Sequence, residues 1–210
     1  MSTKSFVSAP IDTYQTIFSD GQSLFKDRGS KFLGYAEMHN TVEAAKNRIQ
    51  ELRDLHPKAC HVCFAWRIGF NPLEERFSDD GEPNNSAGKP IFGQLIKHDL
   101  QNVLVAVVRY YGGTNLGVGG LITAYKTAAA EAIESAELGI QEIELQFQLR
   151  FDQTSTGNAM NLLNKTEATI QEHGFDENGP FIRGTIKKSK SEVMENEVHQ
   201  HHLISLKLWN

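Results

Sequence analysis

Three carboxylates crowd into one short turn of this chain: Asp79, Asp80 and Glu82, around Gly81. Carboxylates at this density can hold a divalent cation or act as general bases. Asp-Gly and Glu-Pro are also turn formers, but like charges so close repel each other unless a cation or a basic side chain compensates. The favoured interpretation is an ion pair, with metal binding and simple solvation as alternatives. The basic partners that the sequence offers are Arg67, Lys89 and Arg109.

A glycine loop follows an apolar, valine-rich run that ends at Arg109. The order indicates a buried strand, a loop and the N-terminus of a helix. Such a loop exposes backbone N–H groups at the positive end of a helix, beside a fixed arginine, which suits an anion such as phosphate. The alternative is that the glycines serve a tight crossover and close packing. These glycines are Gly112, Gly113, Gly117, Gly119 and Gly120.

Further basic residues lie in or next to these loops. Lys89, in Ala-Gly-Lys-Pro, is placed to meet a phosphate as a point charge. The spacing of a P-loop is absent, so nucleotide hydrolysis of that type is unsupported. A local anion- or nucleic-acid-binding patch is one interpretation, and scattered, solvated charge is the other. The candidates for the patch are Lys26, Arg28, Lys31, Arg67, Lys89 and Arg109.

Cys60 and Cys63 have the spacing of a zinc or redox motif. The residues that follow read as a strand, in which side chains alternate between faces, so the two sulfurs point opposite ways. We therefore predict neither a metal site nor a redox pair. The same alternation places His61 and Arg67 on one face, where His61 is either a catalytic candidate or a hydrogen-bonded strand-edge residue. Three further histidines are interpreted as surface residues: His199, His201 and His202.

The composition is that of an ordinary soluble protein. The 210 residues include 21 Lys and Arg against 26 Asp and Glu, for a net charge of −5. A strongly basic nucleic-acid-binding chain is therefore excluded, because neutralised phosphates supply most of the affinity of such proteins. No apolar stretch approaches the length of a membrane span, and the first residues lack the apolar core of a signal peptide. Together with the low cysteine content, this predicts a cytoplasmic protein.

The pattern of the chain changes near residue 140, which predicts an α+β protein of two domains, 1–139 and 140–210. The first domain is expected to contain strands at 32–39 and 61–69, a helix at 41–55, a long loop at 70–90, a short helix at 91–97, a buried strand ending at Tyr110, and a helix from Gly117 to a C-cap at Gly139. The second is expected to contain strands at 145–151, 170–175, 180–188 and 202–209, with helices at 154–169 and 189–200. This β-α-β-β-α-β order is the ferredoxin-like pattern.

Three motifs in order, at residues 61–69, 77–90 and 109–121, resemble the signature set of the IMPACT family. That family comprises bacterial YigZ-like proteins and a eukaryotic translation regulator. The resemblance covers about the first two-thirds of the chain, and the remainder is similar to the small C-terminal domain of bacterial members. It implies a first domain similar to domain IV of elongation factor G and to a ribosomal protein domain. It also implies a second domain similar to domain V of that factor.

Two hypotheses about function follow. The first, favoured on the resemblance, is a non-enzymatic regulator or binding factor that contacts RNA, a ribosome or a translation factor. The second is an enzyme acting on a phosphate-bearing small molecule, with His61 and the acidic turn 79–82 as catalytic or metal-binding groups. No cofactor is expected, and a monomer is favoured. The kinase-regulating role of the eukaryotic branch is not carried over, because the N-terminal partner-binding domain that accompanies it is not recognisable here.

Overall fold

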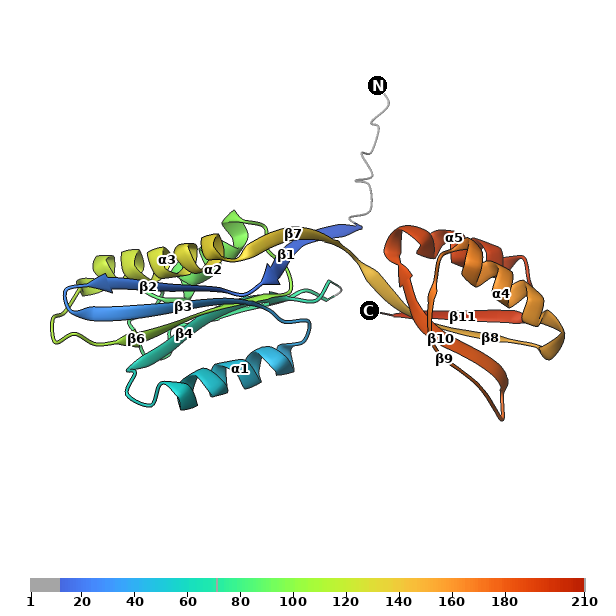
Figure 1. Ribbon diagram of the computed structural model, residues 1–210, viewed down its shortest axis with the longest axis horizontal. Helices are drawn as coiled ribbons and strands as arrows, with labels where there is room; N and C mark the ends of the chain where they lie inside the picture. Colours follow the sequence, from blue (N-terminus) through green and yellow to red (C-terminus); the bar gives the residue numbers. More distant parts are fainter. Residues whose placement is uncertain (1–11, 71, 210) are drawn as a thin grey trace, which may run out of the picture. The chain divides into compact units, whose positions relative to one another are not determined.

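The computed structural model describes residues 12–70 and 72–209, which form two compact units (Figure 1). The larger unit is Gln15–Gln141. The smaller unit contains the chain from Glu142 onward, and Tyr14 and the described residues before it belong to the same unit. Strand β1 (Thr13–Ser19) pairs with β7 (Glu137–Glu142) in a two-stranded sheet next to the unit boundary.

The larger unit is built on a five-stranded sheet of order β2-β3-β6-β4-β5, in which every neighbouring pair is antiparallel. Strand β6 lies at its centre and is buried almost along its whole length. The strands are β2 (Gly21–Asp27), β3 (Ser30–Met38), β4 (His61–Ile68), β5 (Glu74–Ser78) and β6 (Val103–Tyr110).

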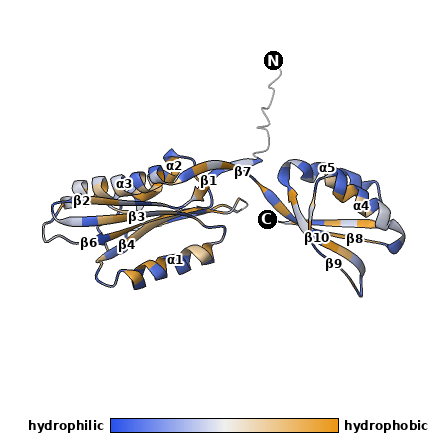
Figure 2. Cartoon of the chain, in the orientation of Figure 1, coloured by the Kyte–Doolittle hydropathy of each residue, from blue (hydrophilic) through white to orange (hydrophobic). Residues whose placement is uncertain are grey.

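Helices cover both faces of this sheet, with α1 (Val42–Leu55) on one face and α2 (Gly88–Lys97) and α3 (Gly117–Ser135) on the other (Figure 1). Along β6, Val105 belongs to the core beneath α2 and α3, whereas Ala106 belongs to the core beneath α1. A strand that is buried on both faces needs apolar residues at every position, which explains the valine-rich run. Figure 2 shows hydrophobic and hydrophilic residues mixed along α1, as expected of a helix that buries one side.

Several of the helices and strands expected from the sequence are present, and others differ in their bounds or type. Thr41 caps α1 by accepting a hydrogen bond from the backbone N–H of Ala44 at 3.2 Å. The expected loop at 70–90 is instead interrupted by β5, and α2 begins at Gly88 rather than at 91. The expected C-cap at Gly139 is also wrong, because α3 ends at Ser135 and Gly139 lies within β7. There the ring of Phe18 occupies the space that a side chain would need.

The smaller unit has the element order β-α-β-β-α-β and a four-stranded antiparallel sheet of order β11-β8-β10-β9. Its helices lie on one face of the sheet (Figure 1), where they enclose a core that includes Phe147, Leu149 and Met194. The elements are β8 (Glu144–Phe151), a 3-10 turn (Gln153–Ser155), α4 (Thr156–Lys165), β9 (Thr169–Asp176), β10 (Gly179–Lys187), α5 (Lys188–His199) and β11 (Ile204–Trp209). Within the described ranges of both units, no helix is at once long enough and apolar enough to span a membrane.

We predict that the larger unit folds by itself when the cut spares β7. A fragment of residues 1–142 keeps both β1 and β7, and thermal unfolding followed by circular dichroism should show one cooperative transition. A fragment of residues 1–136 loses β7 and leaves β1 without its partner, so its melting temperature should be lower. A fragment 1–142 without a thermal transition would show that the boundary is misplaced.

A buried ion pair fixes α1 to the sheet. Glu37, near the end of β3, is 8% exposed and accepts hydrogen bonds from Arg48 Nε at 2.8 Å and Nη2 at 2.8 Å. His39 Nε2 lies 3.3 Å from the same carboxylate. Burial by itself would raise the pKa of Glu37, but the hydrogen bonds of His39 and Arg48 and the charge of Arg48 outweigh it and lower the pKa to about 2.

This pair predicts a loss of stability in acid. Because the pKa of Glu37 is lower in the folded than in the unfolded chain, its contribution is complete above about pH 4.5 and is lost as the pH falls toward 2. Glu37→Gln should lower the free energy of unfolding at pH 7 by about 2–3 kcal/mol and flatten its decline between those pH values. Glu51→Gln removes an exposed carboxylate bonded to the same Arg48 and should cost under about 1 kcal/mol. Urea unfolding across this pH range measures both variants, and identical pH profiles would contradict the assignment.

Candidate functional site

Most of the candidate residues gather at one end of the five-stranded sheet. His61, which opens β4, is in register with Arg109 near the end of β6, and Lys31 is in register with Tyr110. Strand β5 ends at this side too, since Ser78 is opposite Phe64, and the acidic turn follows at once. The N-terminus of α3 follows the end of β6, and that of α2 is bonded to Asp79. The sequence motifs therefore converge in space.

Asp79 caps α2 from outside the helix. Its Oδ1 accepts hydrogen bonds from the backbone N–H groups of Ala87 at 3.0 Å and Gly88 at 2.8 Å, and its Oδ2 accepts one from Asn85 at 2.8 Å. The N-cap residue, Ala87, has no side chain that can do this. Gly88 is required here because the backbone of Ser78 lies where a side chain would project. Asp79 thus serves the fold rather than an open site.

Asp80 ties the acidic turn to α1 and β4. Its Oδ1 accepts a hydrogen bond from Arg53 Nη2 at 2.9 Å, and its Oδ2 accepts one from the backbone N–H of Val62 at 2.7 Å. The carbonyl oxygen of Asp80 lies 2.7 Å from Nδ1 of His61, whose ring nitrogen donates to it. His61 is therefore held in a fixed orientation at the start of β4.

Glu82 is the most enclosed carboxylate of the turn, with 8% exposure. Its Oε1 accepts hydrogen bonds from Arg109 Nη1 at 2.6 Å and from the hydroxyl of Tyr125 at 2.7 Å, and His61 Nε2 lies 3.9 Å away. Burial raises the pKa of Tyr125, so this phenol stays protonated and donates. The acidic turn is compensated by a buried ion pair, with Arg109 as the partner.

Arg109 is buried between two aromatic rings. The centre of its guanidinium is 5.5 Å from the ring of Phe32 and 5.5 Å from that of Tyr111, and the residue is 6% exposed. Its buried Nε has no hydrogen-bond partner among the described residues. Enclosure and the bond to Glu82 together make Arg109 a poor candidate for direct contact with a large anion.

Arg67 does not join this group. It lies near the opposite end of β4, in register with Val103. Its Nε donates to Glu75 at 2.8 Å and its Nη1 donates to the carbonyl oxygen of Leu100 at 3.0 Å. Arg67 therefore stabilises the far end of the sheet.

The cysteines and histidines contribute no cluster. Cys63 is buried and its Sγ donates to the carbonyl oxygen of Asp79 at 3.0 Å, and burial raises the pKa of the thiol. Cys60 is exposed just before β4. Within the described ranges, no group of three or more His, Cys, Asp or Glu side chains is arranged to hold a metal ion.

The remaining cations are exposed. Lys26, Arg28 and Lys31 lie at the end of the β2–β3 hairpin, where Lys26 is in register with Lys31. Lys89 is exposed in the first turn of α2. The hairpin turn packs on the glycine loop, because Gly112 donates its backbone N–H to Ser30 Oγ at 3.1 Å and lies against the backbone of Gly29.

The fold requires glycine at some positions of the loop but not at all of them. Gly112 meets the backbone of Gly29 too closely for a side chain, whereas Gly113 and Gly117 have left-handed φ values of 84° and 72°. Gly119 has neither requirement, since a side chain would enter open space. A glycine in a helix costs about 1 kcal/mol relative to alanine, so its presence is unexplained by the fold. The N-cap of α3, Leu116, makes no side-chain hydrogen bond to the helix.

Two residues of this site, Arg53 and Tyr125, were not predicted from the sequence. Tyr125 lies in an alanine-rich helical stretch with no motif around it, and Arg53 lies on α1, far from Asp80 in the sequence. The apolar periodicity of α3 was the available signal for Tyr125, because it predicts that position on the buried side.

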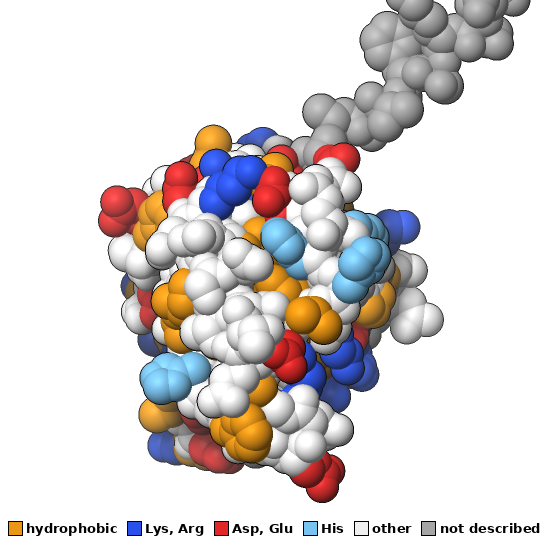
Figure 3. Space-filling model, turned by 90° about the vertical axis from the view of Figure 1, so that its right-hand side faces the viewer, with side chains coloured by type: hydrophobic (Ala, Val, Ile, Leu, Met, Phe, Trp, Pro, Cys, Tyr) orange, Lys and Arg blue, Asp and Glu red, His pale blue; other side chains and the backbone are white. Residues whose placement is uncertain are grey.

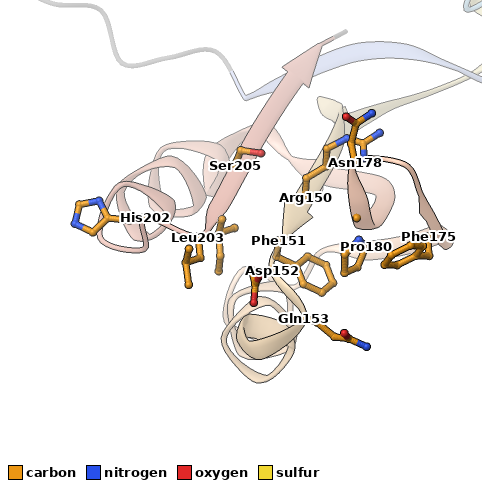
Figure 4. A pocket seen from close by; sticks show the side chains of 12 residues that line it. Arg150, Phe151, Asp152, Gln153, Phe175, Asn178, Pro180, His202, Leu203 and Ser205 are labelled. Carbon is orange, nitrogen blue, oxygen red and sulfur yellow. The ribbon is translucent and has the colours of Figure 1, made fainter.

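Several hollows, with volumes of about 470–590 Å³, are lined by residues of the smaller unit. One, of about 550 Å³, includes Arg150, Phe151 and His202 in its lining (Figure 4). Asp176 holds both terminal nitrogens of Arg150 at 2.8 Å, so the guanidinium is already paired. The surface that faces the viewer in Figure 3 mixes hydrophobic, basic, acidic and histidine side chains without a broad patch of one kind. The predicted surface histidines are exposed at His199 and His202 and half-buried at His201.

Fold and site together define a class of two-unit α+β proteins whose acidic turn, strand-end arginine and glycine loop meet at one sheet end. Residues 28–133 match the family model of the Impact N-terminal domain. The IMPACT family member YvyE of Bacillus subtilis is 31% identical over 173 residues, which span 81% of this chain and 79% of that protein. An IMPACT family member of Haemophilus influenzae is 34% identical over 172 residues, spanning 79% and 84%. The chain belongs to the IMPACT family.

The chain is also similar to further proteins. YigZ of Escherichia coli is 42% identical over 106 residues, which span 50% of this chain and 52% of that protein. A crystal structure of a hypothetical protein superposes with a TM-score of 0.73 at 26% identity, covering 95% of this chain and 97% of that one. A protein described as the two-domain translational regulator Yih1 is 26% identical, covers 65% of this chain and 54% of that one, and gives a TM-score of 0.40.

We predict that the Arg109–Glu82 pair stabilises the fold. Arg109→Ala leaves a buried carboxylate without its cation and should lower the free energy of unfolding by about 3–5 kcal/mol. The double variant Arg109→Met, Glu82→Gln should lose less free energy of unfolding than the sum of the losses in Arg109→Met and Glu82→Gln measured separately. Arg53→Ala, which removes the half-exposed partner of Asp80, should cost about 1 kcal/mol or less. Additive single and double effects in chemical denaturation would argue against coupling.

Proposed function

We propose that this protein is a non-enzymatic regulatory factor linked to translation that binds structured RNA of the ribosome. The contact surface would be the cationic end of the larger unit, here called the hairpin surface. It comprises the side chains of Lys26, Arg28, Lys31 and Lys89 with the backbone of Gly112, Gly113, Gly117, Gly119 and Gly120.

The observation that supports binding over catalysis is the state of the acidic turn. Asp79 caps α2, Asp80 bonds Arg53 and Val62, and Glu82 bonds Arg109 and Tyr125. A general base or a metal ligand needs a carboxylate that can reach a substrate or an ion. The enzyme hypothesis uses these same groups, which are engaged in the fold, so it is the weaker of the two.

The exposed groups at the same sheet end suit an anion. The hairpin cations have their charged ends in water, apart from a 3.9 Å contact between Arg28 and Asp27, both of them partly exposed. Such exposed pairs are weak and exchange readily. Open space at Gly119 allows a phosphate to approach the first turn of α3, where backbone N–H groups and the helix dipole favour negative charge.

The link to translation comes from family membership. The IMPACT homologue of Saccharomyces cerevisiae is 34% identical over 96 residues, which span 43% of this chain. The eukaryotic branch includes the translation regulator that gives the family its name. The similarity expected with domain IV of elongation factor G belongs to the same proposal, since that factor works on the ribosome.

The test is binding of purified protein to ribosomal subunits and to labelled ribosomal RNA across a range of salt. The variant Lys26→Ala, Arg28→Ala, Lys31→Ala should bind at least tenfold more weakly, and its log affinity should depend less steeply on log salt. Lys89→Ala should give a smaller loss in the same direction. Lys46→Ala, Lys97→Ala is the charge control, because both residues are exposed and belong to no part of the hairpin surface.

Two results would overturn the proposal. One is a charge-control variant that loses as much affinity for RNA as the hairpin variant does, since equal losses indicate non-specific charge attraction. The other is co-purification of a protein partner whose affinity is unchanged in the hairpin variant, with no RNA binding. Turnover of a phosphorylated metabolite that is abolished by Glu82→Gln in folded protein would favour the enzyme hypothesis.

A further inference from the structure

One face of the four-stranded sheet in the smaller unit is left without a helix. Both α4 and α5 lie on the opposite face (Figure 1), and no other described element of this unit covers the open one. Burial alternates accordingly along β8, where Phe147 and Leu149 are buried and Gln146 and Gln148 are half-exposed. The open face thus presents a flat set of polar and aromatic side chains.

The strand register arranges these side chains in rows across the sheet. Lys207 is opposite Gln148, which is opposite Arg183. One row away, Trp209 is opposite Gln146, which is opposite Thr185. On the other side, Ser205 is opposite Arg150, which is opposite Phe181. Neighbouring strands are about 4.8 Å apart and neighbouring rows about 6.7 Å, so adjacent side chains are close enough to contact one ligand.

Cations accompany both aromatic rings of this face. Arg183 lies 4.8 Å from the ring centre of Phe181, and Lys207 lies 6.0 Å from that of Trp209. Trp209 is 39% exposed. A hollow of about 470 Å³ is lined by Gln148, Arg183, Lys207 and Trp209. A planar ring, two cations and an amide therefore converge on one open space.

Charge is distributed unevenly over the face. Toward β9, Arg183 donates to Glu172 at 2.9 Å and Arg150 is held by Asp176. Toward β11, the outward positions Ser205, Lys207 and Trp209 include no carboxylate, and no described ion pair neutralises Lys207. Lys207 is thus the charged side chain nearest Trp209 on β11, whereas the outward carboxylate Glu144 of β8 lies one row beyond Gln146, opposite Lys187. An anionic ligand with an aromatic ring fits beside Lys207 and Trp209.

We propose that this open face, here called the Trp209 surface, binds single-stranded RNA. A base stacks on the ring of Trp209, the amides of Gln146 and Gln148 reach base edges, and Lys207 meets the phosphate backbone. Arg183, fixed by Gln148 at 2.9 Å, offers its guanidinium plane to a second base. Four-stranded sheets with aromatic residues on an open face recognise RNA in this way. A protein partner fits less well, because the rows are dominated by amide, hydroxyl and charged groups rather than an apolar core.

This inference goes beyond the proposed function. The Trp209 surface and the hairpin surface share no residue and belong to different units. The hairpin surface would contact phosphates of structured RNA, whereas the Trp209 surface would stack on unpaired bases. Variants of either surface therefore test one proposal without changing the other.

The experiment uses the full chain and labelled single-stranded RNA of about ten nucleotides, within the usual range of site sizes for such surfaces. Fluorescence anisotropy should give binding that Trp209→Ala weakens at least tenfold and that Trp209→Phe, which keeps an aromatic ring, weakens about threefold or less. Lys207→Ala should weaken binding several-fold and reduce its salt dependence. Lys190→Ala is the matched control, because Lys190 lies on α5, on the opposite side of the sheet.

Tryptophan fluorescence supplies a second readout that requires no variant. Trp66 is 2% exposed and lies stacked on Phe64 in the larger unit, whereas Trp209 is exposed. Quenching on addition of unlabelled RNA should therefore arise from Trp209 and should vanish in Trp209→Phe, although that variant still binds.

The proposal is overturned if the wild-type protein does not bind the single strand, or if Trp209→Ala and Lys190→Ala bind equally well. It is also overturned if only the hairpin variant Lys26→Ala, Arg28→Ala, Lys31→Ala loses binding, a result that would leave the proposed function standing. Loss of ribosomal binding in the hairpin variant, with single-strand binding intact, supports both assignments. Calorimetry should show the same melting temperature for the Trp209 variants and the wild type, so that a loss of RNA affinity is not caused by unfolding.

Discussion

The larger unit depends on one buried cluster, in which Glu82 accepts hydrogen bonds from Arg109 and Tyr125. These residues come from a turn, a central strand and a helix, so a single carboxylate connects three elements that are distant in the sequence. Enclosure makes each bond costly to break, because any partner left behind is a buried polar group without compensation. The connection holds the acidic turn, the end of β6 and α3 together, and the glycine loop follows directly on the end of β6.

The cluster also separates two kinds of basic residue that look alike in the sequence. Arg109 is enclosed and neutralised, whereas the cations of the hairpin surface remain in water. Charge that is already paired inside a protein contributes to folding, and charge that is solvated can be exchanged for a partner's phosphate. The acidic turn, which suggested catalysis, is thereby part of the scaffold beside the proposed hairpin surface.

The sequence predicted the elements whose patterns are strong and failed where the pattern is weak. The valine-rich run predicted β6, and Thr41 predicted the start of α1, because burial on both faces and helix capping leave clear signatures. Strand β5 was missed, since Glu74–Ser78 is an exposed edge strand whose residues carry no apolar alternation. For the acidic turn, repulsion between the carboxylates correctly predicted a basic partner, yet the sequence offers three candidates, Arg67, Lys89 and Arg109. Only the register of β4 with β6 distinguishes Arg109 from Arg67.

The capping of α2 by Asp79 has a consequence for the order of folding. Gly88, Pro90 and Gly93 make α2 a poor helix on its own, and its first turn has no local cap. The carboxylate that satisfies this turn becomes available only after β4 and β5 have formed a hairpin and the chain has turned back. Helix α2 is thus expected to consolidate after the folding transition state, with φ-values near zero, while the hairpin that carries Asp79 forms earlier. Because the group that caps its first turn is distant in the sequence, α2 should show weaker hydrogen-exchange protection at its N-terminus than the central strand β6 does.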